Sequence, residues 1–307
     1  MSAKSQVTFD ITPEKEASQA NWLYRQLFVY PPAISRRDVH LAGKTAIVTG
    51  SNIGLGLECA RQLLDLGIEK LILAVRDEAK GAAARETLRT ASKAIIEVWK
   101  LDLSHYDSVT AFTERAKTLP RLDFVVLNAG VFKVTFDQNP DTHHEEVIQV
   151  NYLSTALLTI LMLPVIQSKN TSEAPGRLVL LLGQLFMVEL VKRVPPSVAI
   201  INACNPGLCH GSGLHHETTS SVAGYIFATI KRIIGRSTQI GARVLTDAAV
   251  NHGEESHGQY LGDGKLKPFS PIIYKPEGQK LAEVLWQETM DELSFAGVDG
   301  ILKSFSR

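Results

Sequence analysis

From residue 44 to residue 203 the sequence alternates short apolar runs, rich in β-branched residues, with longer amphipathic segments. This alternation predicts βαβ units, in which crossover helices join parallel strands. The runs are apolar at nearly every position, which is typical of strands that helices cover on both faces. We therefore predict an α/β fold with a doubly wound parallel sheet. Its expected strands are residues 44–49, 70–75, 95–101, 122–127, 177–182 and 197–203.

The segments between and after these strands predict the helices of the fold. They are residues 54–67, 78–92, 105–118, 143–167 and 184–194, followed by 221–234, 237–250 and 276–294. No linker-like composition divides this part of the chain, so we expect one domain over residues 41–307. The crossover helix at 184–194 is short, and it follows its strand without a loop.

Residues 1–40 are expected to form an N-terminal helical extension. Thr12, Pro13 and Glu14 provide an N-cap hydroxyl, a proline at the first helical position and an acid in the first turn. The helix would end before Pro31-Pro32. Its apolar face is expected to pack against the main domain and contains Trp22, Leu23, Leu27 and Phe28.

Composition excludes several classes of partner. Basic and acidic residues both number 32, so no net field attracts nucleic acid, and none is expected to bind. The three cysteines lack CxxC spacing, so we predict no metal site and reduced thiols. The N-terminus has no secretory pattern, and the most apolar window, residues 152–166, is shorter than the roughly 18–20 residues of a membrane span. We expect a cytoplasmic protein without a transmembrane segment.

The clearest ligand-binding motif is the sequence TGSNIGLG at residues 49–56, which follows the first strand and opens the first helix. Glycines let the backbone approach a pyrophosphate, whose charge then lies against the N–H groups of the helix N-terminus. The alternative is a tight structural turn, but the strand–turn–helix context favours a Rossmann-like dinucleotide site. The cofactor-binding residues predicted here are Gly50, Ser51, Asn52, Ile53, Gly54 and Gly56.

The second predicted strand ends at Arg76-Asp77, where the ribose of a dinucleotide would lie. An acid at this point accepts a hydrogen bond from the 2′-hydroxyl of NAD, whereas an arginine binds the 2′-phosphate of NADP. Arg76 therefore favours NADP. In the alternative, Arg76 is solvated and Asp77 binds the ribose.

Five motifs follow one another along the chain, namely TGSNIGLG at 49–56, Leu101-Asp102-Leu103, Asn128-Ala129-Gly130, Asn151 and Asn205-Pro206-Gly207. In this order they resemble the short-chain dehydrogenase/reductase family, and most closely the retinol-dehydrogenase-like group that fungi use in secondary metabolism. The resemblance covers the chain from about residue 22 to residue 286 and implies an NADP-dependent oxidoreductase for a small lipophilic alcohol or ketone.

The resemblance also implies roles for these residues. Asp102, followed by Leu103, would bind the adenine amino group, although Asp102 could instead cap the helix that begins near Ser104. Asn128, Ala129 and Gly130 would line the cofactor. Pro206 and Gly207 would lie near the nicotinamide, with Ser212 as the nearest hydroxyl.

The catalytic set of that family is almost entirely missing. The family takes its proton from a tyrosine that a lysine four residues later activates, and a serine after the fifth strand holds the substrate oxygen. None of the seven tyrosines has such a lysine, and the fifth strand runs into Leu181, Leu182 and Gly183. Asn151 is the only residue of this catalytic set that the sequence retains, and it could instead be a structural hydrogen-bonding residue. Loss of a general acid costs about 10²–10⁴ in rate.

Other residues offer weak replacements for the missing acid. Tyr152 and Tyr225 are expected on the wrong helix faces, and His210 in a loop is usually solvated. The residues missing from the family pattern belong between the fifth strand and the helix at 184–194. The alternatives to an active oxidoreductase are an inactive NADP-binding protein and a non-redox enzyme. A homodimer through this helix also stays open.

Overall fold

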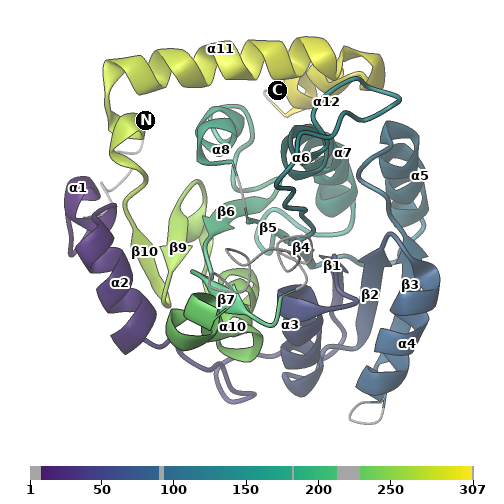
Figure 1. Ribbon diagram of the computed structural model, residues 1–307. Coiled ribbons are helices and arrows are strands. Elements are labelled where there is room, and N and C mark those ends of the chain that lie inside the picture. Colours follow the sequence, from purple (N-terminus) through teal and green to yellow (C-terminus); the bar gives the residue numbers. More distant parts are fainter. Residues whose placement is uncertain (1–7, 90–92, 182, 213–228, 306–307) are drawn as a thin grey trace.

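A central sheet organises the computed structural model, which describes residues 8–89, 93–181, 183–212 and 229–305 (Figure 1). The strand order is β10-β9-β6-β5-β4-β1-β2-β3, and only β10 is antiparallel to its neighbour in this sheet. The predicted doubly wound α/β fold is confirmed, and all six predicted strands are present. The strands are β1 (Thr45–Thr49), β2 (Lys70–Val75), β3 (Ile95–Lys100), β4 (Phe124–Leu127), β5 (Arg177–Leu180), β6 (Ile200–Cys204), β9 (Tyr260–Gly262) and β10 (Lys265–Lys267).

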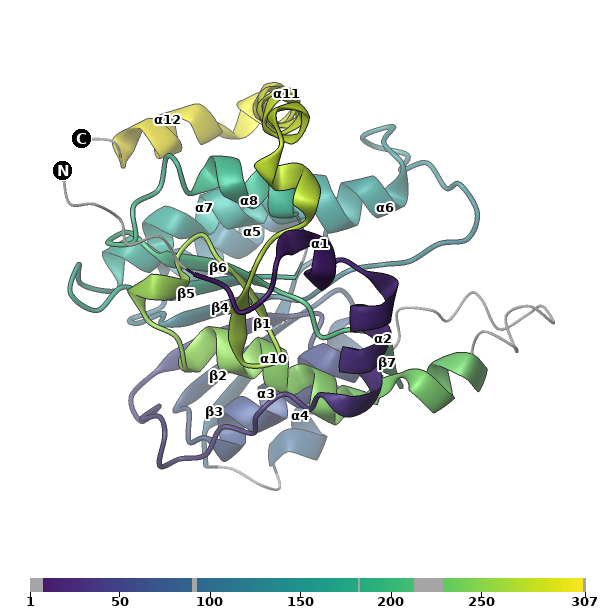
Figure 2. The ribbon, with the colours of Figure 1, turned by 90° about the vertical axis from the view of Figure 1, so that its left-hand side faces the viewer.

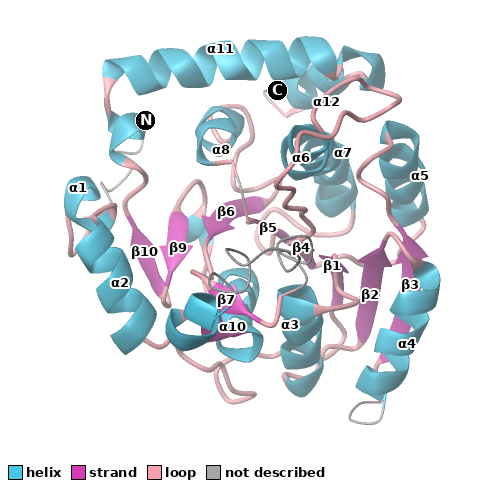
Figure 3. Cartoon of the chain, viewed as in Figure 1, coloured by secondary structure: helices cyan, strands magenta, loops and turns pink. Residues whose placement is uncertain are grey.

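Helices cover both faces of this sheet (Figures 2 and 3). One face packs against α3 (Gly54–Asp65), α4 (Glu78–Arg89) and α10 (Thr238–Val250). The other face packs against α5 (Tyr106–Lys117), α7 (Ser154–Ser168) and α8 (Gln184–Leu190). An outer layer of α11 (Pro276–Glu292) and α12 (Val298–Ser304) lies over α8 and α7, and α12 was not predicted. Smaller elements are β7 (Cys209–His210) and β8 (Arg236–Ser237).

The fourth predicted helix is longer than its apolar window. It runs from α6 (Glu146–Ile148) through a π-helical turn, Gln149–Leu153, into α7. Within the described residues, only this run of 23 residues, Glu146–Ser168, has the length and composition of a membrane span. The expectation that the segment is too short was therefore wrong, because the helix continues through the polar residues before the window. The expected buried helix is confirmed, since α7 lies in the core of one sheet face.

The junction between β5 and α8 is held by glycine and by apolar packing. Gly183 has φ 90° and ψ 51°, a left-handed conformation that glycine adopts without a steric penalty. Phe186 then stacks on Trp286 of α11, with ring centroids 5.5 Å apart, and meets the edge of Tyr152 at 6.1 Å. The guanidinium of Arg193 also lies over the Trp286 ring, 4.3 Å from the ring centroid. The shortened crossover is thus covered by α11.

The N-terminal extension differs from the prediction. It forms two helices, α1 (Pro13–Glu16) and α2 (Gln19–Phe28), because Ser18 starts a new helix by accepting a hydrogen bond from Asn21 N at 3.2 Å. The expected apolar packing face was wrong, since Trp22 is 41% exposed and Phe28 is 68% exposed. Polar side chains face the domain instead, because Arg25 pairs with Asp263 at 2.6 Å.

We predict that Trp286→Ala lowers the free energy of unfolding by about 3–5 kcal/mol, because it leaves a cavity over α8. Val284→Ala on the same helix is the matched control, since Val284 is 47% exposed and should change stability by less than about 0.5 kcal/mol. Urea unfolding followed by circular dichroism measures both. Equal effects of the two substitutions would show that α11 is not part of the core.

Candidate functional site

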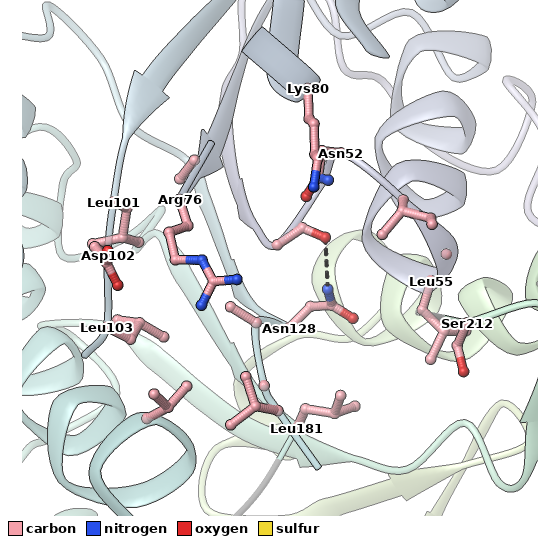
Figure 4. A pocket seen from close by; sticks show the side chains of 18 of the residues that line it. Asn52, Leu55, Arg76, Lys80, Leu101, Asp102, Leu103, Asn128, Leu181 and Ser212 are labelled. Atoms are coloured by element: carbon pink, nitrogen blue, oxygen red, sulfur yellow. Dashed lines mark hydrogen bonds between the residues drawn. The ribbon is translucent and has the colours of Figure 1, made fainter. Parts of the chain in front are cut away.

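A cavity of about 460 Å³ lies at the carboxyl ends of the parallel strands (Figure 4). Gly50 follows β1, Arg76 follows β2, Leu101 follows β3 and Asn128 follows β4, so four strand ends contribute to one wall. The strand order reverses between β1 and β4, and ligands of doubly wound sheets bind at such a switch point. The fold therefore brings together residues of three predicted motifs, TGSNIGLG, Leu101-Asp102-Leu103 and Asn128-Ala129-Gly130.

The glycine turn is shaped by close backbone contacts. Gly50 has φ 64°, and a Cβ there would lie 2.9 Å from the Cα of Ala129. A Cβ on Gly56 would lie 2.5 Å from the carbonyl oxygen of Gly50. The first turn of α3 has no side-chain cap, so its N–H groups stay available to an anion in the cavity.

Thr49 ties the turn after β1 to the turn after β4. Its buried Oγ1 accepts hydrogen bonds from Asn128 N at 3.0 Å and from Ala129 N at 2.9 Å. In return, Asn128 Nδ2 donates to the Thr49 carbonyl at 2.9 Å. These three bonds fix the back of the cavity. The sequence motifs contained Thr49, but they did not identify this role.

Two cations line the cavity at the end of β2. Figure 4 shows the guanidinium of Arg76 extending toward the centre of the cavity, and Lys80 is drawn beside Asn52 as another lining residue. Asp77 is not among the lining residues; its carboxylate accepts a hydrogen bond from Lys80 N at 3.0 Å, which lowers the pKa of Asp77. Sequence reasoning missed Lys80, although its spacing of four from Arg76 places it in the first turn of α4.

Asp102 lies between two apolar wall residues, Leu101 and Leu103. Its Oδ1 accepts a hydrogen bond from Ser104 N at 3.2 Å. The following helix α5 has His105 as its N-cap residue and no side-chain cap, so Asp102 does not cap it. The second carboxylate oxygen has no hydrogen bond to any residue that the structure describes, and it can accept one from a ligand.

Several predicted residues lie behind the cavity surface or away from it. Ser51 is buried and donates to the Val48 carbonyl at 2.8 Å. Gly56, Pro206 and Gly207 are not lining residues, and Gly207 lies against Gln26 of α2. In addition to Gly50, Arg76, Asp102 and Asn128, seven other predicted residues line the cavity, namely Asn52, Ile53, Gly54, Leu103, Ala129, Gly130 and Ser212.

Ser212 brings a buried lysine close to the cavity. The Ser212 hydroxyl donates to the Cys209 carbonyl at 3.3 Å and receives a hydrogen bond from Lys231 Nζ at 3.4 Å. Lys231 is buried, and desolvation lowers its pKa. Tyr225, one of the weak replacement acids in the sequence, lies outside the described residues.

Asn151 makes two hydrogen bonds with the backbone of the loop after β4. Its Oδ1 accepts from Val131 N at 2.8 Å, and its Nδ2 donates to the Val131 carbonyl at 2.8 Å. The π-helical turn that contains Asn151 places the amide against this loop. Both amide atoms therefore have structural partners.

The described tyrosines and histidines do not line this cavity. The Tyr152 hydroxyl hydrogen-bonds Thr289 Oγ1 at 2.7 Å, and burial raises its pKa. Tyr106 donates to Glu292 at 3.0 Å, and its pKa is also raised, mainly by burial. His210 lies in the small strand β7. The described residues thus supply no imidazole or phenol next to a bound cofactor.

The cysteines are buried, free thiols. Burial raises the pKa of Cys59 to about 12 and that of Cys209 to about 11, so neither is a ready nucleophile at neutral pH. In the described part of the chain, no group of three His, Cys, Asp or Glu side chains could hold a metal ion.

We predict that Thr49→Val destabilises the protein by about 2–4 kcal/mol, because two buried N–H groups lose their acceptor. Thr113→Val is the matched control: this buried hydroxyl only donates to a carbonyl of its own helix, Val109 O, at 3.0 Å. Thermal unfolding of both variants checks the difference. A loss for Thr113→Val as large as that for Thr49→Val would contradict the assigned role.

Known proteins with similar sequences support this geometry. The family model described as short chain dehydrogenase matches residues 44–180, and its match ends at the last residue of β5. A short-chain dehydrogenase of Aspergillus ruber is 48% identical and covers 98% of this chain and 99% of its own length. A short chain dehydrogenase/reductase of Annulohypoxylon moriforme is 39% identical over 92% of this chain and 94% of its own.

One solved structure has a similar fold and was determined with NADP bound. It is the 3-oxoacyl (acyl-carrier-protein) reductase of Agrobacterium tumefaciens, with a TM-score of 0.60, 18% identity, and coverage of 74% of this chain and 95% of its own. The alignment with the Aspergillus ruber protein has 347 positions, whereas this chain has 307 residues. That relative therefore contains residues that align with gaps in this chain. The extent of these matches shows that the chain belongs to the short-chain dehydrogenase/reductase family of oxidoreductases.

Proposed function

We propose that this protein binds NADP(H) in the cavity at the ends of β1 to β4. The observation that carries the proposal is that two cations, Arg76 and Lys80, line the cavity and Asp77 does not, although its carboxylate lies 3.8 Å from Lys80 Nζ. A 2′-phosphate favours two cations at this point, and a carboxylate would repel it. The pair therefore supports NADP over NAD.

The other walls fit the remaining parts of this cofactor. The uncapped N–H groups of α3 suit the pyrophosphate, because the positive end of a helix stabilises negative charge. The part of the cavity that Leu101 and Leu103 line suits a flat apolar ring such as adenine. Asp102 Oδ2, which has no hydrogen bond to a described residue, can accept one from the adenine amino group. When bound, the cofactor supplies or accepts a hydride.

We further propose that the reaction is the interconversion of a small lipophilic alcohol and ketone in secondary metabolism, as the sequence resemblance implies. Hydride transfer also needs a group that gives the substrate oxygen its proton. The cavity walls described here contain no tyrosine or histidine, and the Asn151 amide is bound to Val131. The residues that line the cavity therefore support cofactor binding better than they support proton transfer to the substrate.

A second candidate, an NADP-binding protein with little turnover, is favoured by the junction after β5. The family match ends at Leu180, three residues before the left-handed Gly183. The longer alignment with the Aspergillus ruber relative also requires residues that this chain lacks. The end of the family match supports the proposal that the missing segment belongs between Leu181 and Gln184, where the family's serine, tyrosine and lysine would stand.

We predict that Arg76→Ala weakens NADPH binding about 10–100-fold but changes NADH binding less than about twofold, because only NADPH carries the 2′-phosphate. Lys80→Ala should have the same selectivity with a smaller effect. Arg85→Ala is the control, since Arg85 lies on α4 outside the cavity wall and pairs with Glu86. Isothermal titration of the natural chain and of each variant gives the affinities for NADPH and NADH. An equal loss for both cofactors would place the phosphate elsewhere.

Inserting the segment of the Aspergillus ruber relative that aligns between Leu181 and Gln184 should raise ketone reduction at least about 10²-fold over the natural chain, because it restores a general acid. NADPH affinity should stay within about threefold. Stopped-flow measurement of cofactor oxidation with a panel of lipophilic ketones checks the rate. An insert of equal length, with its tyrosine replaced by phenylalanine, is the control. Equal rates for the natural chain and the chimera would contradict a catalytic loss at this junction.

A further inference from the structure

A second cavity, of about 380 Å³, is lined by residues of the N-terminal extension and of the main domain. Figure 1 shows that α1 and α2 of this extension lie beside the sheet edge that ends in β9 and β10. The second cavity shares no lining residue with the first cavity. Trp22, Arg25 and Gln26 of α2 form one side. Gln184 at the start of α8 and Arg236 of β8 contribute from the main domain. Its volume is within the usual range for small-molecule sites.

A buried ionic cluster forms part of the wall. Arg236 pairs with Asp263 at 2.8 Å, and Asp263 also pairs with Arg25 at 2.6 Å. Arg25 pairs with Glu16, which Lys267 approaches to 3.5 Å. The cluster thus has three basic groups and two carboxylates. Of these five residues, Arg25, Arg236 and Glu16 line the cavity, so its wall has an excess of one positive charge, which favours an anionic ligand.

Arg236 has one donor without an acceptor. Its side chain is 4% exposed, and its Nη2 donates to the carbonyls of Arg25 and Val29, each at 2.8 Å. Its Nε, in contrast, is buried and has no hydrogen-bond partner in the described part of the protein. A buried donor without an acceptor is unfavourable, and an acceptor on a bound ligand would remove that penalty.

Gln184 offers another donor at the same cavity. Its Oε1 accepts a hydrogen bond from Ser270 N at 3.1 Å, which fixes the direction of the amide. The Nε2 has no hydrogen bond to any described residue, so it can donate to a ligand. The cavity therefore combines a guanidinium and an amide donor.

Aromatic side chains form the apolar part of the wall. Tyr260 and Phe269 are buried, with ring centroids 6.3 Å apart, and Trp22 is 41% exposed. Aromatic walls favour a flat ring in offset or edge-to-face contact. Donors, excess positive charge and rings together define the ligand class.

We propose that this second cavity binds a small aromatic anion. Its carboxylate or phenolate oxygen accepts hydrogen bonds from Arg236 and Gln184, and its ring packs against Trp22 and Phe269. Because the two cavities share no lining residue, this ligand and a nucleotide in the first cavity bind together. The site depends on the N-terminal extension, since α1 and α2 supply a whole side of it.

Isothermal titration of the full chain with benzoate, benzyl alcohol and benzylamine tests the proposal. Benzoate should bind at one site, benzyl alcohol at least about tenfold more weakly because it has no charge, and benzylamine not measurably. Saturating NADPH should leave the benzoate affinity unchanged. No saturable benzoate binding, equal binding of all three compounds, or displacement of benzoate by NADPH would each overturn the proposal.

Two exposed neighbours on α2 provide a matched pair of variants. Trp22→Ala should weaken benzoate binding about five- to tenfold, because Trp22 lines the cavity. Leu23→Ala should leave it unchanged, since Leu23 is 43% exposed and is not a lining residue. Gln184→Ala should weaken binding about threefold or more. Unfolding curves confirm that each variant is folded. Unchanged benzoate affinity in both Trp22→Ala and Gln184→Ala would contradict the site.

Discussion

The cavity at the carboxyl ends of β1 to β4 depends on the hydrogen bonds between Thr49 and the turn after β4. One hydroxyl accepts from two consecutive N–H groups, and the Asn128 amide returns a bond to the turn after β1. This arrangement sets the distance between the two strand ends where the sheet order reverses. The close approach of Gly50 to Ala129 follows from it, and the uncapped start of α3 faces the same cavity. None of these contacts involves the junction after β5.

That independence explains how a sheet with an incomplete crossover can keep a well-formed nucleotide cavity. The residues after β5 need only return the chain to β6, and α8 does so with Phe186 held between Tyr152 and Trp286. The C-terminal helix α11 thus covers a crossover that would otherwise expose its apolar side. The hydrogen bonds that shape the cavity thus lie outside the junction, although Leu181 of the junction lines the cavity.

Local patterns predicted most of the fold. The six strands and the glycine turn were found because apolar runs and glycine positions report directly on burial and backbone conformation. The orientation of α2 was not predicted, because the partners of Arg25 include Asp263, which is distant in sequence. Lys80 was missed because its role depends on where α4 begins relative to β2. The second cavity could not be predicted, since its wall combines both ends of the chain.

The central claim is that this chain has a complete NADP site and an incomplete catalytic site. The most direct measurement combines two readings on the natural chain: titration with NADPH, and then the absorbance of the bound cofactor after excess lipophilic ketone is added. We predict micromolar NADPH binding, about −8 kcal/mol, with cofactor oxidation at least about 10²-fold slower than in the Aspergillus ruber relative. Rapid oxidation of bound NADPH, or no NADPH binding, would contradict the claim.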